Sequence, residues 1–193
     1  MKSTSNEWPI PVNPEPPFPI VTDFCDIVFG FGRGSAELGI PTANVPLEQL
    51  PKETQDLELG VYFGFAILKP ISHEETTAVR KDGRKVTYNY GKHLSKSSGD
   101  LDILPVVLSV GKNPFYHNVM KTVELHILHH FESDFYGAQV KFNLLGRIRP
   151  ERNYNTKEAL INDINHDKLI AQDVLSKGNY LKYERQLAEG CNE

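Results

Sequence analysis

Apolar residues recur along most of the chain with the two-residue period, or in the short unbroken runs, that are typical of β-strands. Over 121–131, Val123, Leu125 and Ile127 alternate with polar side chains, which indicates a half-buried strand. The same reasoning predicts strands over 22–29, 60–68, 104–111 and 138–150. The pattern therefore predicts a mainly β protein.

Beyond residue 150 the apolar period changes to that of a helix. Asn155 and Glu158 have the spacing of a capping pair, and Gly178 can end the helix. The apolar stripe between them consists of Leu160, Ile164, Leu169, Ile170 and Val174. Many strands followed by one terminal helix predict an antiparallel barrel or sandwich that carries a helix, and not a βαβ fold.

The chain is expected to form a single domain. Its 193 residues are 39% hydrophobic and 24% charged, which is ordinary for a globular protein. Residues 1–20 are rich in proline and predict an extended arm, 21–185 form the domain, and 186–193 form a tail. The polar stretch at about 69–102 predicts a long insertion between paired strands, with a small hairpin near 86–90.

Composition excludes several classes of protein. With 21 basic and 25 acidic residues the net charge is −4, which gives no general attraction to nucleic acid or anionic lipid. There is no apolar run of the ~20 residues that span a bilayer, and no secretion signal. Cys25 and Cys191 lie far apart without metal-ligand spacing, so we expect no zinc site, no disulfide and a reducing intracellular compartment.

The glycine cluster at 30–35, GFGRGS, does not match the standard phosphate-binding loops. After Gly34 and Gly39, Ile40 and Pro41 stand where a Walker loop requires Lys and Ser or Thr. A dinucleotide-binding fingerprint fails because the third glycine comes one position early. The cluster can still present backbone N–H groups to an anion, although a glycine-rich turn is the simpler interpretation.

Two polar positions on predicted strands can carry chemistry. Thr42 and Asn44 share one face if they lie on a strand, and their hydroxyl and amide oxygens suit Mg²⁺. The alternative is a turn with ordinary side-chain-to-backbone hydrogen bonds. Glu124 can accept a proton from a substrate hydroxyl if it points into a cleft, and is otherwise a solvated strand residue.

Three histidines and a basic and aromatic group near residue 150 can each be interpreted as functional or as structural. His126, His129 and His130 lack the H-E-x-x-H spacing of a zinc site, so we expect surface or packing histidines. Arg149, Arg152 and Tyr154 can orient a planar ring or a phosphorylated product, whereas a cluster of loop salt bridges is the alternative.

Five segments in a fixed order closely resemble the riboflavin kinases, ATP:riboflavin 5′-phosphotransferases, of the monofunctional eukaryotic, fungal-like type. They are 30–46, 60–66, 109–118, 123–137 and 146–154, and the resemblance extends from 23 to about 175 apart from the insertion. It implies a six-stranded antiparallel Greek-key β-barrel with a C-terminal α-helix. It also implies transfer of the γ-phosphate of ATP to the 5′-hydroxyl of riboflavin, giving FMN and ADP, with Mg²⁺ or alternatively Zn²⁺ or Mn²⁺.

The resemblance assigns a role to each candidate residue. Glu124 is the implied catalytic base, and Thr42 and Asn44 hold the metal ion. The implied ATP-binding residues are Gly30, Phe31, Gly32, Arg33, Gly34, Ser35, Ile127, His129 and Tyr136. The implied flavin-binding residues are Arg149, Arg152 and Tyr154. Ala36 departs from the family pattern, because many relatives carry Lys there.

Two other functions remain open at this point. A noncatalytic flavin- or nucleotide-binding β-barrel is the first alternative, and an OB-like nucleic-acid binder, which lacks the basic face it needs, is the second. The expected partners are the small molecules ATP and riboflavin, with no nucleic acid. We expect a cytoplasmic monomer, with peripheral association with mitochondria or endoplasmic reticulum as the alternative. A chain of this length leaves no room for an adenylyltransferase domain, so the expected product is FMN.

Overall fold

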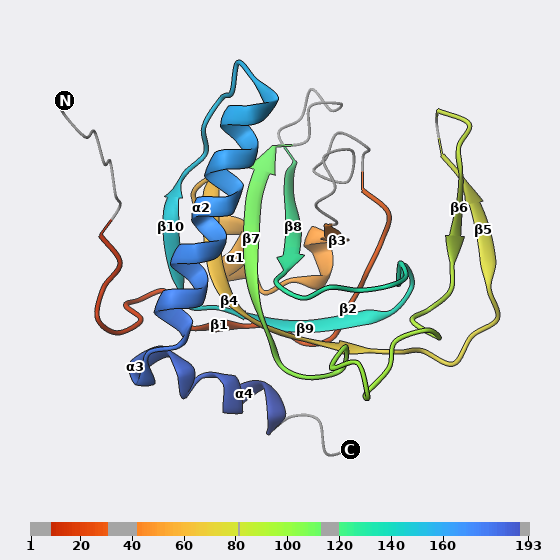
Figure 1. The fold of residues 1–193 in the computed structure, drawn as a ribbon, viewed down its shortest axis with the longest axis horizontal. Coiled ribbons are helices and arrows are strands. Elements are labelled where there is room, and N and C mark those ends of the chain that lie inside the picture. Colours follow the sequence, from red (N-terminus) through yellow and green to blue (C-terminus); the bar gives the residue numbers. More distant parts are fainter. Residues whose placement is uncertain (1–8, 31–41, 81, 113–119, 190–193) are drawn as a thin grey trace.

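The chain forms a curled antiparallel β-sheet with a long helix lying across its outer face (Figure 1). The structure is a computed structural model, and it describes residues 9–30, 42–80, 82–112 and 120–189. The strands are β1 (Ile20–Val21), β2 (Cys25–Asp26), β3 (Ala43–Val45), β4 (Gly60–Lys69), β5 (Thr76–Val79), β6 (Lys85–Tyr88), β7 (Leu104–Lys112), β8 (Lys121–Ile127), β9 (Gln139–Leu144) and β10 (Gly146–Pro150). The helices are the 3-10 turn η2 (Leu47–Gln49), α1 (Lys52–Asp56), α2 (Lys157–Leu175), α3 (Gly178–Leu181) and α4 (Glu184–Ala188).

Every strand pair in the main sheet is antiparallel. The order is β1-β9-β4-β7-β8-β3, with β10 beside β4 and β2 beside β9. A bridge from Val28, just after β2, to Asn44 of β3 joins the two sides of the curled sheet, and the Val28 N–H donates to the Asn44 carbonyl at 2.9 Å. Apart from the two-residue strands β1 and β2, six strands build this sheet. The predicted mainly β, antiparallel barrel with a C-terminal helix is confirmed.

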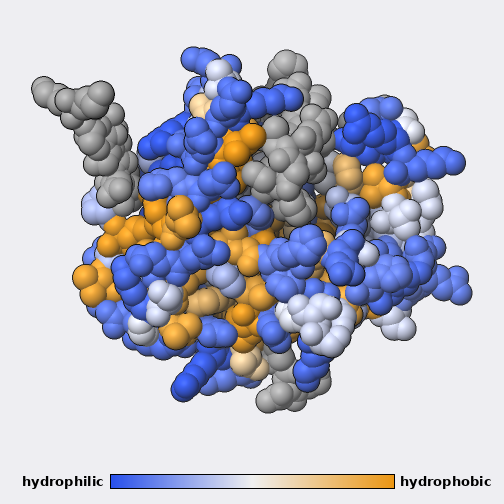
Figure 2. All heavy atoms as spheres, in the orientation of Figure 1, coloured by the Kyte–Doolittle hydropathy of each residue, from blue (hydrophilic) through white to orange (hydrophobic). Residues whose placement is uncertain are grey.

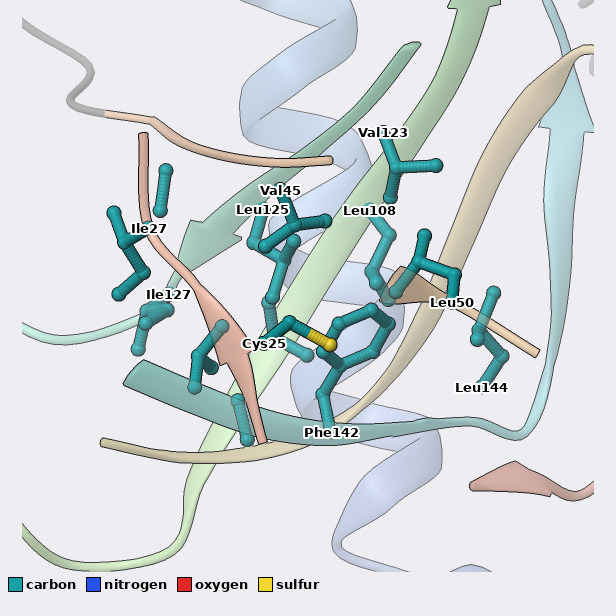
Figure 3. Close-up of a cluster of buried hydrophobic side chains, with 14 of the residues drawn as sticks. Cys25, Ile27, Val45, Leu50, Leu108, Val123, Leu125, Ile127, Phe142 and Leu144 are labelled. Carbon is teal, nitrogen blue, oxygen red and sulfur yellow. The ribbon is translucent and has the colours of Figure 1, made fainter. Parts of the chain in front are cut away.

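The inner face of the sheet encloses an apolar core. Cys25, Leu108, Leu125 and Phe142, from four different strands, are each 0% exposed and point toward one another (Figure 3). Burial raises the pKa of the Cys25 thiol to about 11, so the group stays protonated near neutrality. The alternation along β8 places its apolar residues in this core, as the two-residue period predicts.

A second core lies between the outer face and the C-terminal helices. Val61, Phe63 and Phe65 of β4 pack there with Val174 and Leu175 of α2, while Tyr62, Ala66 and Leu68 of β4 face the inner core. A strand covered on both faces has no polar side to alternate with, which explains the unbroken apolar run over 60–68.

Helix α2 differs from the prediction at its start and on its buried face. Thr156, not Asn155, is the N-cap, because its Oγ1 accepts the hydrogen bond from the Ala159 N–H at 3.1 Å. Leu169 of the predicted stripe is 65% exposed, and Asp167 and Ala171 are buried instead. The helix ends at Leu175, and two short helices follow it where one terminal helix was expected.

The predicted strand over 138–150 is divided at Leu145 into β9 and β10. The Leu145 N–H donates to the Phe63 carbonyl at 2.9 Å, and the two strands pair with different halves of β4. Gly64 permits this arrangement, because a Cβ at that position would lie 1.9 Å from the Asn143 carbonyl oxygen.

The polar stretch between β4 and β7 contains the hairpin β5–β6 and contributes to the core. Leu94 and Leu101 from this stretch pack against the inner core, which its polar composition did not predict. The N-terminal segment also contacts the barrel: Phe18 packs against the inner core and Ile10 against the second core.

The surface in view in Figure 2 is largely hydrophilic, and hydrophobic residues are exposed mainly on the left and through the middle of the view. Among the residues that the structure describes, no helix combines the length and the apolar character that crossing a membrane requires.

Candidate active site

A row of residues crosses the outer face of the sheet and connects candidates that are far apart in sequence. Asn44 on β3 pairs directly with Glu124 on β8, and Glu124 pairs with Ser109 on β7. Ser109 pairs in turn with Val61 on β4, and Val61 with Arg149 on β10. Because directly paired residues of antiparallel strands project from the same face, these five side chains share one surface.

A cavity of about 270 Å³, here called the larger cavity, lies between this row and α2. Glu124, Arg149, Arg152 and Tyr154 line it together with His126. Its remaining lining residues are Thr42, Gly60, Val61, Val107, Ser109, Glu151, Leu160, Ile164 and Asp167. The predicted base and the three predicted ring-binding residues are therefore neighbours in one cavity.

A smaller cavity of about 70 Å³ lies at the end of the inner core. Its lining residues are Ile27, Thr42, Ala43, Leu125, Ile127, Phe131, Asp134, Phe135 and Tyr136. Thr42 lines both cavities. The two cavities therefore meet at Thr42, so a molecule bound in one can contact a molecule bound in the other at this residue.

Glu124 has the electrostatic character of a proton acceptor. Its carboxyl group is half-buried in the larger cavity, and burial raises its pKa above the ordinary value of 4.5. Within the described part of the chain no Lys or Arg forms an ion pair with it. A carboxylate whose pKa is raised toward neutrality is a stronger base for a hydroxyl proton than an exposed one.

Thr42 directly precedes β3, and Asn44 lies on the side of β3 that faces away from the core. Ala43, between them, is buried in the inner core, so the two-residue period of a strand directs Asn44 outward. Asn44 is 8% exposed, and Gly30 lies so close that a Cβ there would be 2.2 Å from Asn44 Nδ2. A hydroxyl and an amide oxygen two residues apart, beside a close-packed backbone, fit the hard-oxygen preference of a divalent ion such as Mg²⁺.

The histidines have different surroundings. His126 lies in the larger cavity, where burial and the nearby charge of Lys168 lower its pKa to about 4, so it is neutral at physiological pH. His129 is not among the lining residues of either cavity. Its Nε2 lies 2.9 Å from Asp100 Oδ1, and its ring packs edge-on against Phe131. Of the predicted nucleotide-side residues, Ile127 and Tyr136 line the smaller cavity.

The basic and aromatic group of the larger cavity is held in place by acids of α2. Arg149 Nη2 and Asp167 Oδ2 are 2.8 Å apart with both side chains buried. Asp163 accepts a hydrogen bond from Arg152 at 2.9 Å and one from the Tyr154 hydroxyl at 2.6 Å. Burial and the bond to Asp163 raise the pKa of Tyr154 to about 12. These residues line the cavity and also form the salt-bridge cluster that was the alternative interpretation.

Several candidates lie outside the described residues: Phe31, Gly32, Arg33, Gly34, Ser35 and Ala36. Within the described ranges no group of three or more His, Cys, Asp or Glu side chains is placed to hold a metal ion. Sequence reasoning did not find Ser109 or Asp167. Ser109 is marked only by being a polar residue within an apolar strand run, and Asp167 by being an acid within a helical stripe.

Comparison with known proteins finds one family repeatedly. The family model described as Flavokinase, riboflavin kinase, matches residues 24–175. A riboflavin kinase of Saccharomyces cerevisiae is 64% identical over 94% of this chain and 84% of its own length. A riboflavin kinase of Candida glabrata is 60% identical over 93% of this chain and 95% of its own. The crystal structure of riboflavin kinase from Trypanosoma brucei has a similar fold, with a TM-score of 0.60 at 23% identity over 91% of both chains.

Proposed function

The chain belongs to the riboflavin kinase family, and from this premise we propose how its two cavities divide the reaction between them. The reaction is the ATP-dependent phosphorylation of riboflavin to FMN. The larger cavity takes riboflavin, and the smaller one belongs to the nucleotide side, with Thr42 between them. The observation that supports this division is that Glu124 lines the larger cavity while Thr42 lines both.

Glu124 is the proposed general base. The 5′-hydroxyl oxygen of riboflavin forms a bond to the γ-phosphorus, the bond from that phosphorus to the β,γ-bridging oxygen breaks, and ADP leaves. The hydroxyl proton goes to the Glu124 carboxylate. Phosphoryl transfer depends mainly on alignment and charge stabilisation, so a base held rigidly in a strand beside the acceptor supplies what the protein must provide.

Thr42 and Asn44 are the proposed ligands of the divalent ion, for which we propose Mg²⁺. When bound, the ion neutralises charge on the phosphates. Gly30 and the glycine cluster 31–35 are proposed to contribute backbone N–H groups to the same phosphates. Local donors of this kind allow a chain of net charge −4 to bind a polyanion.

The flavin ring is proposed to lie against Arg149, Arg152 and Tyr154. Ile164 and Leu160 of α2 line the same cavity and offer apolar surface to a planar ring. Arg149 is occupied by its buried ion pair with Asp167, so its proposed role is to shape the cavity wall and not to contribute a free charge.

The experiment that tests the base is a comparison of purified wild-type protein with Glu124→Gln. With ATP, Mg²⁺ and riboflavin, chromatography of the flavins should show FMN from the wild type, and the variant should lose about 10²–10⁴-fold in kcat. Glu53→Gln, which removes an exposed carboxylate on α1, is the matched control and should keep full activity. Near-normal turnover by the Glu124→Gln variant would exclude Glu124 as the base. If the wild type bound flavin without any turnover, the alternative of a noncatalytic flavin-binding barrel would be selected.

We further propose that the enzyme acts as a monomer. Light scattering at the concentration of the activity assay measures this directly.

A further inference from the structure

The hairpin β5–β6 reaches back from the polar stretch to the nucleotide side of the barrel. In Figure 1 it stands beside the chain that leaves β2. The Phe29 N–H donates to the Tyr88 hydroxyl at 3.1 Å, although the two residues are 59 positions apart. The bond is partly buried. Since buried N–H groups are almost always paired, Tyr88 supplies a partner that this segment needs.

The ring of Tyr88 continues the same contact toward the smaller cavity. Its centroid lies 5.9 Å from that of Tyr136, and the Phe29 ring lies 5.2 Å from Tyr136. Both distances fall in the range of favourable aromatic pairs. Tyr136 lines the smaller cavity, so the ring of Tyr88 supports one of its walls from behind.

A cation from the hairpin adds to this cluster. The Arg80 guanidinium lies over the Phe29 ring at 4.3 Å from its centroid, and Asp82 holds it at 3.3 Å. Phe29 is thus fixed through its backbone by Tyr88 and through its ring by Arg80. The next residue, Gly30, packs directly on the Asn44 amide.

We propose that Tyr88 is a positioning residue for the nucleotide, which makes this hairpin part of the kinase site. Its hydroxyl fixes the backbone at Phe29, directly before Gly30, and its ring fixes Tyr136 at the cavity wall. The inference rests on the proposed assignment of the smaller cavity to the nucleotide. Under this inference the polar stretch at about 69–102 has a role in binding ATP and none in binding riboflavin.

The test compares Tyr88→Phe with Tyr90→Phe. Tyr88→Phe removes the hydroxyl that accepts the Phe29 N–H, and should raise the KM for MgATP about fivefold, the factor that one net hydrogen bond produces. The KM for riboflavin and kcat should stay unchanged. Tyr90→Phe removes the 3.0 Å hydrogen bond between Tyr90, two residues after β6, and Thr76 of β5, and should change neither KM.

Calorimetric titration with MgADP separates this inference from the proposed reaction, because it needs no turnover. Weaker MgADP binding by Tyr88→Phe, with wild-type binding by Tyr90→Phe, supports the role even if the wild type forms no FMN. Equal MgADP affinity in Tyr88→Phe and wild type overturns it. An equal rise of both KM values also overturns it, because general loosening of the barrel would act on both substrates.

Discussion

Glu124 is subject to two opposed demands. As a base it must be ionised, while its position between the sheet and α2 removes it from water and disfavours the charge. Its neighbours across the strands, Asn44 and Ser109, are neutral and do not offset this cost. The folded protein therefore gives up stability at neutral pH to keep a carboxylate in the cavity.

This cost can be measured with Glu124→Gln. Because the folded-state pKa of Glu124 is raised above its unfolded value, the stability from this group is present at low pH and is lost as pH rises through the folded pKa. At pH 7 the variant should melt above wild type. The difference should vanish below the ordinary carboxyl pKa. A variant that melts lower at pH 7 would show that the carboxylate is stabilised by contacts of its own.

The same group predicts the acid side of the activity profile. Since only the ionised carboxylate accepts the proton, kcat/KM should fall as pH drops through the raised pKa of Glu124, at a pH above the ordinary value of 4.5. Rates measured at saturating metal ion between pH 4 and 8 check this. His126, with a pKa lowered to about 4, should not add a second step near pH 6.5; a second step there that His126→Gln removes would contradict its neutral state.

Among the elements of the fold, α2 forms one wall of the larger cavity and is fixed to the sheet by acids. Asp167 lies on the buried side of the helix with Ala171, Val174 and Leu175, and it meets Arg149 of β10 there. Asp163, one turn earlier, holds Arg152 and Tyr154. The cavity wall is therefore a helix joined by its charges to the loop and strand that precede it.

Two aspartates of α2 provide a matched test. Asp167→Ala leaves the buried Arg149 guanidinium without its partner and should reduce the free energy of unfolding by about 3–5 kcal/mol. Asp173→Ala breaks an exposed pair between this helix and Lys177, which lies two residues beyond its end, and should change the stability little. Urea titration of both variants measures the difference. Similar losses in the two would show that helix propensity, and not the buried pair, determines the stability of α2.

The elements could be predicted from the sequence more fully than the contacts between them. The alternation of β8 and the apolar run of β4 are local signals. The strand β4 forms where predicted, and β8 begins where predicted but ends at Ile127, four residues before the predicted end at 131. The predicted N-cap of α2, Asn155, was wrong by one residue. Asn155 and Thr156 are both good N-cap residues, and only the backbone geometry selects Thr156. Asp167 could not be recognised as buried, since the Arg149 that pairs with it lies on another element.

The candidate site shows the same limit. Glu124, Thr42 and Asn44 could be named as candidates because each residue type suits the chemistry and the motifs resemble a known family. The row that joins Asn44 to Glu124 and Ser109 depends on strand register, which a single sequence does not contain. Likewise, nothing in the composition of the polar stretch shows that Tyr88 contacts Phe29.

For the molecule as a whole, the N-terminal segment is bound to the C-terminal helices. The Tyr180 hydroxyl donates to the Pro11 carbonyl at 2.7 Å, and Asn179 Nδ2 donates to the Val12 carbonyl at 3.3 Å. Ile10 packs into the second core beside them. Residues 10–12 and helix α3 therefore cover the same side of the barrel.

Deletion of residues 1–19 should consequently lower stability and leave the chemistry intact. The loss of Ile10 and Phe18, both partly buried, should cost about 1–3 kcal/mol. Thermal melting together with FMN formation measures the two effects separately. An unchanged melting temperature would mean that the segment contributes no net stability, whereas Tyr180→Phe, which removes one hydrogen bond only, should give a smaller loss than the deletion.

The thiol of Cys25 is a probe for opening of the barrel. It is 0% exposed, it lies in the inner core (Figure 3), and its raised pKa keeps it protonated, so a disulfide reagent can reach it only when the sheet opens. With Cys191 replaced by serine, the labelling rate reports the frequency of that opening. A substrate bound in the cavities should then slow the labelling of Cys25. At a fixed concentration, a substrate that binds more tightly should slow the labelling more, so binding can be followed without any catalytic turnover.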